Sequence, residues 1–152
     1  MDLILWRHAE AEDLLPDAAR ALTAKGQKQA QKVAQWLKPR LPQDVRIIVS
    51  PAKRTQQTAL ALTTHFEISE QVGTGTTPYK VLNSIAWPEA EETVLIVGHQ
   101  PTLGKIASLL LTGNDGGVSV RKGSIWWFSH KQKNDQENIT LRAVMTPEIA
   151  SV

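Results

Sequence analysis

The sequence has 152 residues, of which 41% are hydrophobic and 21% charged, with 17 basic and 15 acidic side chains. This composition predicts one globular domain over residues 1–152 and excludes a disordered tail or a fibre. The absence of cysteine excludes a disulfide scaffold, a thiolate nucleophile and a cysteine-ligated metal site. Because no apolar run is long enough to cross a membrane, we expect a cytoplasmic protein with no membrane partner.

Positive charge is concentrated in residues 21–60, which hold eight cations and one anion. Half of these cations follow a helical spacing, which is typical of a solvated helix face: Lys25, Lys28, Lys32 and Lys38. The sequence has no zinc-finger spacing, no RNA-binding motif of the RNP type and no basic helix followed by heptads. We therefore expect no nucleic-acid partner.

Strand and helix patterns alternate from the N-terminus onward. The apolar run from Leu3 to Trp6 predicts a strand buried on both faces. A helix is predicted next, with Thr23 as its N-cap and Pro39 beyond its end. Its apolar stripe recurs at helical spacing: Ala30, Val33, Ala34 and Leu37.

A second buried strand is predicted from Val45 to Val49. Directly after it, Ser50 and Pro51 predict a helix start, with the serine hydroxyl as N-cap and proline in the first turn. This helix is expected to run to about His65. Residues 69–80 are rich in glycine, proline and threonine, so we expect a connecting loop there.

The second half begins with a weaker helical segment at 82–92, and Thr93 to Val97 predicts a third buried strand. An apolar helical stripe then ends at Gly113. Two β-type runs, at 124–129 and 138–144, predict an antiparallel pair at a sheet edge, joined by the polar stretch 131–137. The expected fold is therefore a single three-layer α/β domain whose central, mainly parallel sheet is flanked by helices.

Three predicted strands end in residues suited to binding phosphate. Arg7 and His8 follow the first strand, Arg54 lies just after the second, and His99 follows the third. The carboxyl ends of parallel strands meet at one sheet edge, so these side chains can converge. Guanidinium groups bind the oxygens of a phosphoryl group in a bidentate manner, and the N-terminus of a helix also attracts anions.

His8 is the candidate nucleophile. At a strand end, backbone can hold one of its ring nitrogens while the other faces a cleft, and neighbouring cations favour the neutral ring. A neutral imidazole can attack phosphorus and form a covalent phosphohistidine. We interpret His65 and His130, which have no such setting, as structural or exposed histidines.

Four motifs in this order resemble the histidine phosphatase superfamily, and in particular its short SixA-type branch of phosphohistidine phosphatases. They are RHAEA at 7–11, RALTAKG at 20–26, SPAKRTQQTA at 50–59 and VGHQPTL at 97–103. The resemblance covers residues 1–65 and 93–111 and implies a phosphoglycerate-mutase-like fold.

The resemblance also implies roles for single residues. His8 matches the family's nucleophile, Arg7 and Arg54 match its phosphate-binding arginines, and His99 matches the second histidine that supports the phosphoryl group. Arg20 matches an arginine of the SixA-type segment and is a further phosphate-binding candidate. The strand ends offer cations where metal ligands would stand, so we expect neither a metal nor another cofactor.

Larger members of the family use a carboxylic acid to protonate the leaving oxygen, and no equivalent is recognisable here. The segment 66–92 contains five glutamates outside any donor motif, Glu89 among them, and Glu10 and Glu12 are alternative candidates near the first motif. A general acid speeds the departure of an alkoxide by roughly 10²–10⁴-fold. An imidazole leaving group needs less help, so a site without a donor suits phosphohistidine.

The sequence thus predicts a phosphatase that acts on a phosphorylated histidine-containing protein through phospho-His8. Two alternatives stay open: a small-molecule phosphomonoesterase, and a non-catalytic phosphate-binding domain. Neither the identity of the protein substrate nor the oligomeric state can be read from the sequence.

Overall fold

The computed structural model describes residues 1–134 and 136–150 as one α/β domain built on a six-stranded sheet. Residues 151–152, at the end of the predicted range 1–152, and residue 135, in the predicted connection 131–137, lie outside the described residues. The sheet has the strand order β3-β2-β4-β1-β5-β6. The strands are β1 (Asp2–Arg7), β2 (Arg46–Val49), β3 (Glu67–Ile68), β4 (Thr93–Gly98), β5 (Ile125–Lys133) and β6 (Gln136–Met145).

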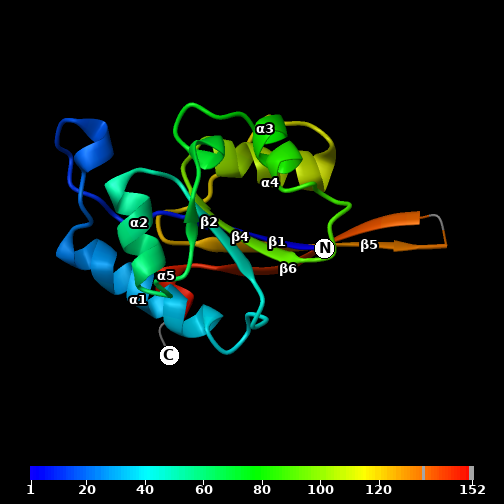
Figure 1. Cartoon of the computed structure of the whole chain (residues 1–152), viewed down its shortest axis with the longest axis horizontal. Coiled ribbons are helices and arrows are strands. Elements are labelled where there is room, and N and C mark those ends of the chain that lie inside the picture. Colours follow the sequence, from blue (N-terminus) through cyan, green and yellow to red (C-terminus); the bar gives the residue numbers. More distant parts are fainter. Residues whose placement is uncertain (135, 151–152) are drawn as a thin grey trace.

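Helices cover both faces of this sheet, as the predicted three-layer architecture requires (Figure 1). On one face lie α1 (Ala24–Leu37), α2 (Lys53–Leu60) and α5 (Pro147–Ala150), and on the other lie α3 (Pro78–Ser84) and α4 (Thr102–Thr112). Two short 3-10 helices, η1 (Asp17–Ala19) and η2 (Glu70–Val72), lie in the connections.

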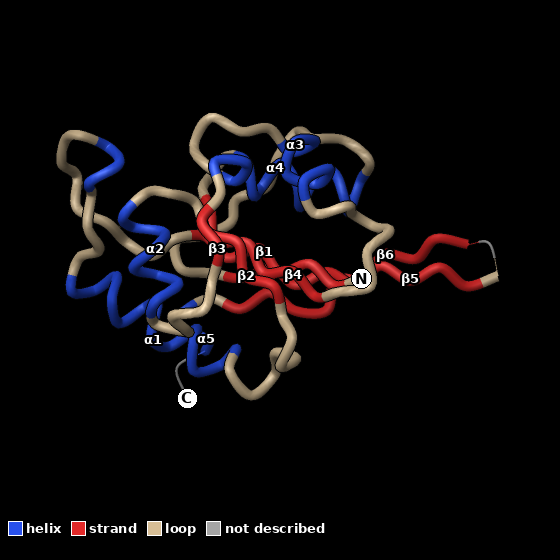
Figure 2. The backbone as a smooth tube through the Cα atoms, in the orientation of Figure 1, coloured by secondary structure: helices blue, strands red, loops and turns tan. Residues whose placement is uncertain are grey.

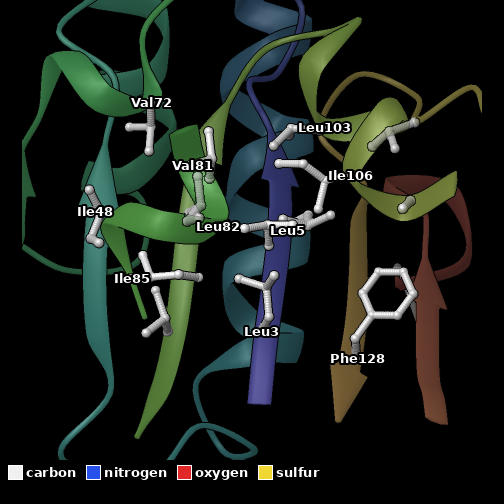
Figure 3. Close-up of a cluster of buried hydrophobic side chains, with 14 residues drawn as sticks. Leu3, Leu5, Ile48, Val72, Val81, Leu82, Ile85, Leu103, Ile106 and Phe128 are labelled. Carbon is white, nitrogen blue, oxygen red and sulfur yellow. The ribbon is translucent and has the colours of Figure 1, made fainter. Parts of the chain in front are cut away.

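The alternating side chains of β1 explain why the sheet is buried on both faces. Leu3 and Leu5 pack with α3 and α4, where the cluster also takes in Ile106 and Phe128 (Figure 3). Ile4 and Trp6 point to the opposite face and pack with α1 and α2. These four apolar side chains of β1 are fully buried, and burying an aliphatic side chain contributes about 1.5–3 kcal/mol.

The pairing of the strands is mixed in the predicted way. β1, β2, β3 and β4 are parallel to one another, whereas β5 runs antiparallel to β1 and β6 runs antiparallel to β5. The β5–β6 hairpin extends beyond the rest of the sheet (Figure 2). It is longer than predicted, because the polar residues on either side of its turn continue the ladder as far as the pair Lys133 and Gln136.

The predicted cap of the first helix is confirmed: the Thr23 side chain accepts a hydrogen bond of 2.9 Å from the Gly26 amide. The end of α4 is confirmed as well, because Gly113 is its C-cap with φ of 80°. Glycine tolerates this left-handed conformation, which other residues rarely adopt.

The predicted bounds of the second and third helices are wrong. α2 begins at Lys53 with Ala52 as its N-cap, because Ala52 keeps an extended backbone with ψ of 146°. The Ser50 hydroxyl lies before the helix, where it contacts His99 and accepts a hydrogen bond of 3.4 Å from the Ala52 amide. It ends at Leu60, well before His65. The expected loop 69–80 contains η2 and the start of α3, whose cap is the Thr77 side chain; the helix ends at Ser84 rather than extending to residue 92.

The register of the three central strands brings their carboxyl ends level with one another. Val97 of β4 pairs with Trp6 of β1 on one side and with Val49 of β2 on the other. Beyond these pairs the chain leaves β1 toward α1 on one face and leaves β4 toward α4 on the opposite face. Such a reversal opens a crevice between neighbouring strand ends, where α/β proteins bind ligands.

Candidate functional site

Backbone hydrogen bonds hold the residues that follow the three strands side by side. The His8 amide donates to Gly98 O over 3.1 Å, and the Ser50 amide donates to Val97 O over 3.1 Å. The rings of His8 and His99 consequently lie with their centroids 5.4 Å apart and their planes inclined by 57°. The predicted convergence of these strand ends is what the geometry shows.

His8 is buried, with 6% of its surface exposed, and its ring orientation is fixed by the backbone. Its Nδ1 lies 2.8 Å from Ala9 O. Because a carbonyl oxygen can only accept, Nδ1 carries the proton and Nε2 keeps its lone pair. Burial, with smaller contributions from the charges around the ring, lowers the pKa of His8 to about 3. The imidazole is therefore neutral at physiological pH.

His99 is neutral with the opposite tautomer. Its Nδ1 lies 3.3 Å from Arg54 Nη2, and its Nε2 lies 2.7 Å from Ser50 Oγ. Since a guanidinium can only donate, Nδ1 accepts and Nε2 donates its proton to the serine. Burial and the positive charge of Arg54 lower the pKa of His99 to about 4.

Arg54 extends from the first turn of α2 into the same place and is 4% exposed. Its Nη1 donates to Asp17 O over 2.9 Å, and its Nη2 donates to Asp17 Oδ2 over 3.1 Å. Desolvation alone would raise the pKa of Asp17, but the hydrogen bonds from Arg20 and Arg54 hold it below its ordinary value. An ionised carboxylate therefore lies on the guanidinium.

Arg7 ends β1 and donates from Nη1 to Val120 O over 3.0 Å. Within the described residues, the Nε atoms of both Arg7 and Arg54 are buried without a hydrogen-bond partner. Buried donors are normally satisfied, and unsatisfied ones at the same sheet edge suit an anion that supplies the missing acceptors.

Arg20 lies at the rim of the site rather than beside His8. Its Nε donates to Glu12 O over 2.7 Å, and its Nη1 contacts Asp17 Oδ1 at 3.2 Å. Asp17 thus bridges Arg20 and Arg54. The charge of Arg20 still reaches the centre, since it contributes to the lowered pKa of His99.

The carboxylates considered as proton donors are placed in three different ways. Glu10 Oε2 accepts a hydrogen bond of 2.7 Å from the Thr23 hydroxyl and so supports the start of α1. Glu12 is exposed. Glu89 lies in the turn before β4, at the amino end of the parallel strands, whereas His8 lies at their carboxyl end.

The sequence pattern missed three residues of this site. Ser50 and Asp17 hold His99 and Arg54, as described above. Glu70, one of the five glutamates of segment 66–92 that lie outside any donor motif, lines a cavity of about 180 Å³ together with Asp17 and Ser50. A polar residue directly after a predicted strand was the available signal for Ser50, but loop residues such as Asp17 carry no comparable signal.

The two other histidines have the settings expected of them. His65 is exposed in the connection after α2. His130 is buried in β5, with its ring 5.8 Å from that of Trp87 and its amide bonded to Met1 O at the far edge of the sheet. Neither lies at the crevice.

In chemical terms the crevice holds two neutral imidazoles, one with a free lone pair, between guanidinium groups. Such a group of residues can bind a phosphoryl group and attack it. Among residues 1–134 and 136–150, no group of three or more histidine or carboxylate side chains is placed to hold a metal ion. None of the described helices has the length and apolarity needed to span a bilayer.

Known proteins resemble this chain in sequence and in fold. The model of the histidine phosphatase superfamily (branch 1) matches residues 3–74. A phosphohistidine phosphatase SixA homolog of Haemophilus influenzae is 38% identical over 130 residues, which cover 72% of this chain and 77% of that protein. The family match includes the segment that holds Arg7, His8 and Arg54.

Solved structures share the whole fold. The protein histidine phosphatase SixA complexed with tungstate superposes with a TM-score of 0.80 at 23% identity, covering 97% of each chain. A phosphoserine phosphatase of Entamoeba histolytica gives 0.70 at 18% identity, covering 97% of this chain and 98% of that one. The family match and the homolog of Haemophilus influenzae identify the class of protein as a phosphatase. The chain belongs to the histidine phosphatase superfamily, in its SixA-type branch.

Proposed function

We propose that this chain hydrolyses phosphohistidine on a protein through a covalent phospho-His8 intermediate and without a metal. The observation that carries the proposal is the setting of His8: a buried neutral ring, with Nδ1 tied to Ala9 O, beside Arg7, Arg54 and His99. The SixA homolog of Haemophilus influenzae, named a phosphohistidine phosphatase, supports the substrate class.

The first half of the reaction transfers the phosphoryl group to His8. The Nε2 lone pair attacks phosphorus and the bond from phosphorus to the substrate's imidazole nitrogen breaks. That nitrogen leaves with the electron pair, as a neutral imidazole whose other ring nitrogen was already protonated in the substrate. Arg7 and Arg54 bind the phosphoryl oxygens, whose charge their guanidinium groups stabilise in the transition state. Asp17 must leave Arg54, or share it, when this anion binds.

The second half releases inorganic phosphate. Water attacks the phosphorus of phospho-His8, the bond to Nε2 breaks, and the ring regains its neutral form. His99, whose Nδ1 faces Arg54, lies beside a phosphoryl group held by that guanidinium. The neutral ring accepts from Arg54 Nη2 and so orients the guanidinium that donates to the phosphoryl oxygens during the reaction.

Glu70 favours one alternative, a small-molecule phosphomonoesterase. Its cavity beside Ser50 could admit an ester whose alkoxide needs a proton. One observation argues against this alternative. Asp17, the other carboxylate of the cavity, is held ionised by two arginines and so cannot donate a proton.

Turnover of two matched peptides decides between the proposals. The peptides share one sequence and carry either phosphohistidine or phosphoserine. We expect kcat/KM for phosphohistidine to be higher by about 10²-fold or more, because the site needs no general acid for an imidazole leaving group. Chelator should leave both rates unchanged, and Glu70→Gln should leave phosphohistidine turnover unchanged.

The opposite pattern would establish the alternative. If phosphoserine is cleaved as well as phosphohistidine and Glu70→Gln abolishes that activity alone, Glu70 is a proton donor and the chain is a phosphomonoesterase. A rate lost to chelator and restored by a divalent cation would refute the metal-free mechanism.

A further inference from the structure

A second charged cavity adjoins Arg7 on the side away from Glu70. It has a volume of about 350 Å³. Its charged lining residues are four cations and two carboxylates: Arg7, Lys25, Arg121, Lys122, Glu10 and Glu148. We call it the basic cavity. Arg7 belongs both to this cavity and to the crevice that holds His8, so an anion bound here lies next to the reacting phosphoryl group.

The loop 118–124 forms one wall of the basic cavity and is hydrogen-bonded to the end of β1 and to Gln100. Val120 O accepts a hydrogen bond of 3.0 Å from Arg7 Nη1. The Gly123 amide is bonded to both Arg7 O and His8 O, at 3.1 and 3.0 Å. Gln100, which follows His99, donates to Val118 O over 3.0 Å. Arg121 and Lys122 therefore stand at a fixed place beside the site.

The cations of the basic cavity are only partly neutralised, because four cations line it together with two carboxylates. In the described part of the chain, Lys25, Arg121 and Lys122 take part in none of the ion pairs. Of the two carboxylates, Glu10 accepts a hydrogen bond from the Thr23 hydroxyl. The pKa of Glu148 is lowered mainly by hydrogen bonds from its own backbone and Thr146, and to a smaller extent by the charges of Arg121 and Lys25. Two positive charges in the cavity remain unbalanced. The excess of positive charge on a concave surface attracts an anion and raises its rate of association.

We propose that the basic cavity binds an acidic side chain of the protein that carries the phosphohistidine. This inference rests on the proposed function and names a feature of its substrate: an aspartate or glutamate close to the phosphorylated histidine. Arg121 offers a carboxylate a bidentate fork, and the lysines offer point charges. No aromatic side chain lines the cavity, so it lacks the stacking surface typical of sites for single-stranded nucleic acid.

The test uses the intact protein and two histidine-phosphorylated peptides that differ only in flanking residues, aspartate in one and asparagine in the other. Wild type should prefer the acidic peptide by about 10-fold in kcat/KM, because each exposed ion pair contributes little alone and three act together. The preference should vanish in a variant that lacks three cations of the cavity: Lys25→Gln, Arg121→Gln and Lys122→Gln. Hydrolysis of p-nitrophenyl phosphate should not change.

A charge-matched control removes three exposed cations far from the crevice: Lys38→Gln, Lys131→Gln and Lys133→Gln. It should keep the preference. If the cavity variant also keeps the preference for the acidic peptide, or loses activity equally on both peptides, the basic cavity does not bind acidic side chains of the substrate.

Failure of the proposed function would give a different result. If wild type cleaves neither peptide, phosphohistidine is not the substrate. Binding to the basic cavity is then measured as inhibition of p-nitrophenyl phosphate hydrolysis. An unphosphorylated acidic peptide should inhibit wild type and not the cavity variant, and equal inhibition of both would overturn the inference. Stronger inhibition of wild type by a single-stranded RNA of equal charge would identify nucleic acid instead of a protein as the ligand.

Discussion

His8 and His99 are buried, uncharged and tied to defined partners, which is unusual for side chains that titrate near neutral pH. The same burial that keeps the His8 lone pair available also makes protonation of both rings unfavourable in the folded state. Burial of the rings therefore both keeps His8 able to attack phosphorus and makes the stability of the fold sensitive to acid.

Stability should fall on acidification in a range set by these two rings. Their folded pKa values of about 3 and about 4 lie below the unfolded value of about 6.5, so only the unfolded state takes up protons between them. The stabilisation is complete above pH 6.5 and is lost as the pH falls. Denaturant unfolding should show a loss of about 2 kcal/mol for each histidine between pH 6.5 and 5.

Matched variants separate this effect from carboxylate titration, which occurs at lower pH. Removal of either ring, in His8→Asn or His99→Asn, should flatten the dependence by about half between pH 6.5 and 5. His65→Asn, at an exposed position, should leave it unchanged. An unaltered slope in the His8 and His99 variants would show that neither ring is held neutral.

At the residue scale, position along the chain predicted the main members of the site but not their supports. Arg7, His8 and His99 follow apolar runs directly, and such runs mark strand ends in a parallel sheet. Asp17 contacts Arg54 across 37 positions of sequence through an irregular loop. Periodicity contains no information about such a contact, because the loop's course depends on tertiary packing.

Among the elements, α4 controls the loop 118–124 through a close approach of backbone to backbone. The Gly104 amide donates to Gln100 Oε1 over 2.7 Å, and a Cβ added at Gly104 would lie 1.9 Å from Val118 O. Only glycine allows this approach. The helix therefore positions the loop that binds Arg7.

Gly104→Ala should displace this loop and lower activity more than a change remote from the site would. The added methyl group meets backbone, so we expect destabilisation of about 1–3 kcal/mol and a fall of about 10-fold in kcat/KM on p-nitrophenyl phosphate. Gly75→Ala is the matched control, because no atom lies within 4 Å of its Cβ position and its φ is ordinary. Normal activity of a folded Gly104→Ala protein would mean that the loop does not position Arg7.

The differences between predicted and observed elements have local causes. Ser50 and Pro51 have the sequence of a helix start, yet Ala52 keeps an extended backbone with ψ of 146° and the helix begins at Lys53. The two-residue strand β3 is too short to give an alternating pattern. The long apolar or amphipathic segments, by contrast, were predicted well because burial on a defined face determines them.

At the scale of the whole molecule, the sheet order explains why residues from four segments meet. β1 and β4 are neighbours although the paired residues Asp2 and Thr93 lie 91 positions apart in the sequence, and the connections after the two strands leave toward opposite faces. The resulting crevice holds His8 opposite His99, with Arg54 from α2 closing one side. The alternation of strands and helices predicted this class of topology. The family resemblance predicted that Arg7, His8, Arg54 and His99 lie together.

The central claim is that His8 becomes phosphorylated during turnover. Rapid quenching of the reaction at alkaline pH, followed by mass spectrometry of peptides, should find phosphate on His8 in a linkage that is stable to base and labile to acid. His8→Ala should remove both the label and the turnover while the protein stays folded, whereas His65→Ala and His130→Ala should keep both. Phosphate trapped on His99 or on a serine, or near-normal turnover by a folded His8→Ala protein, would contradict the account.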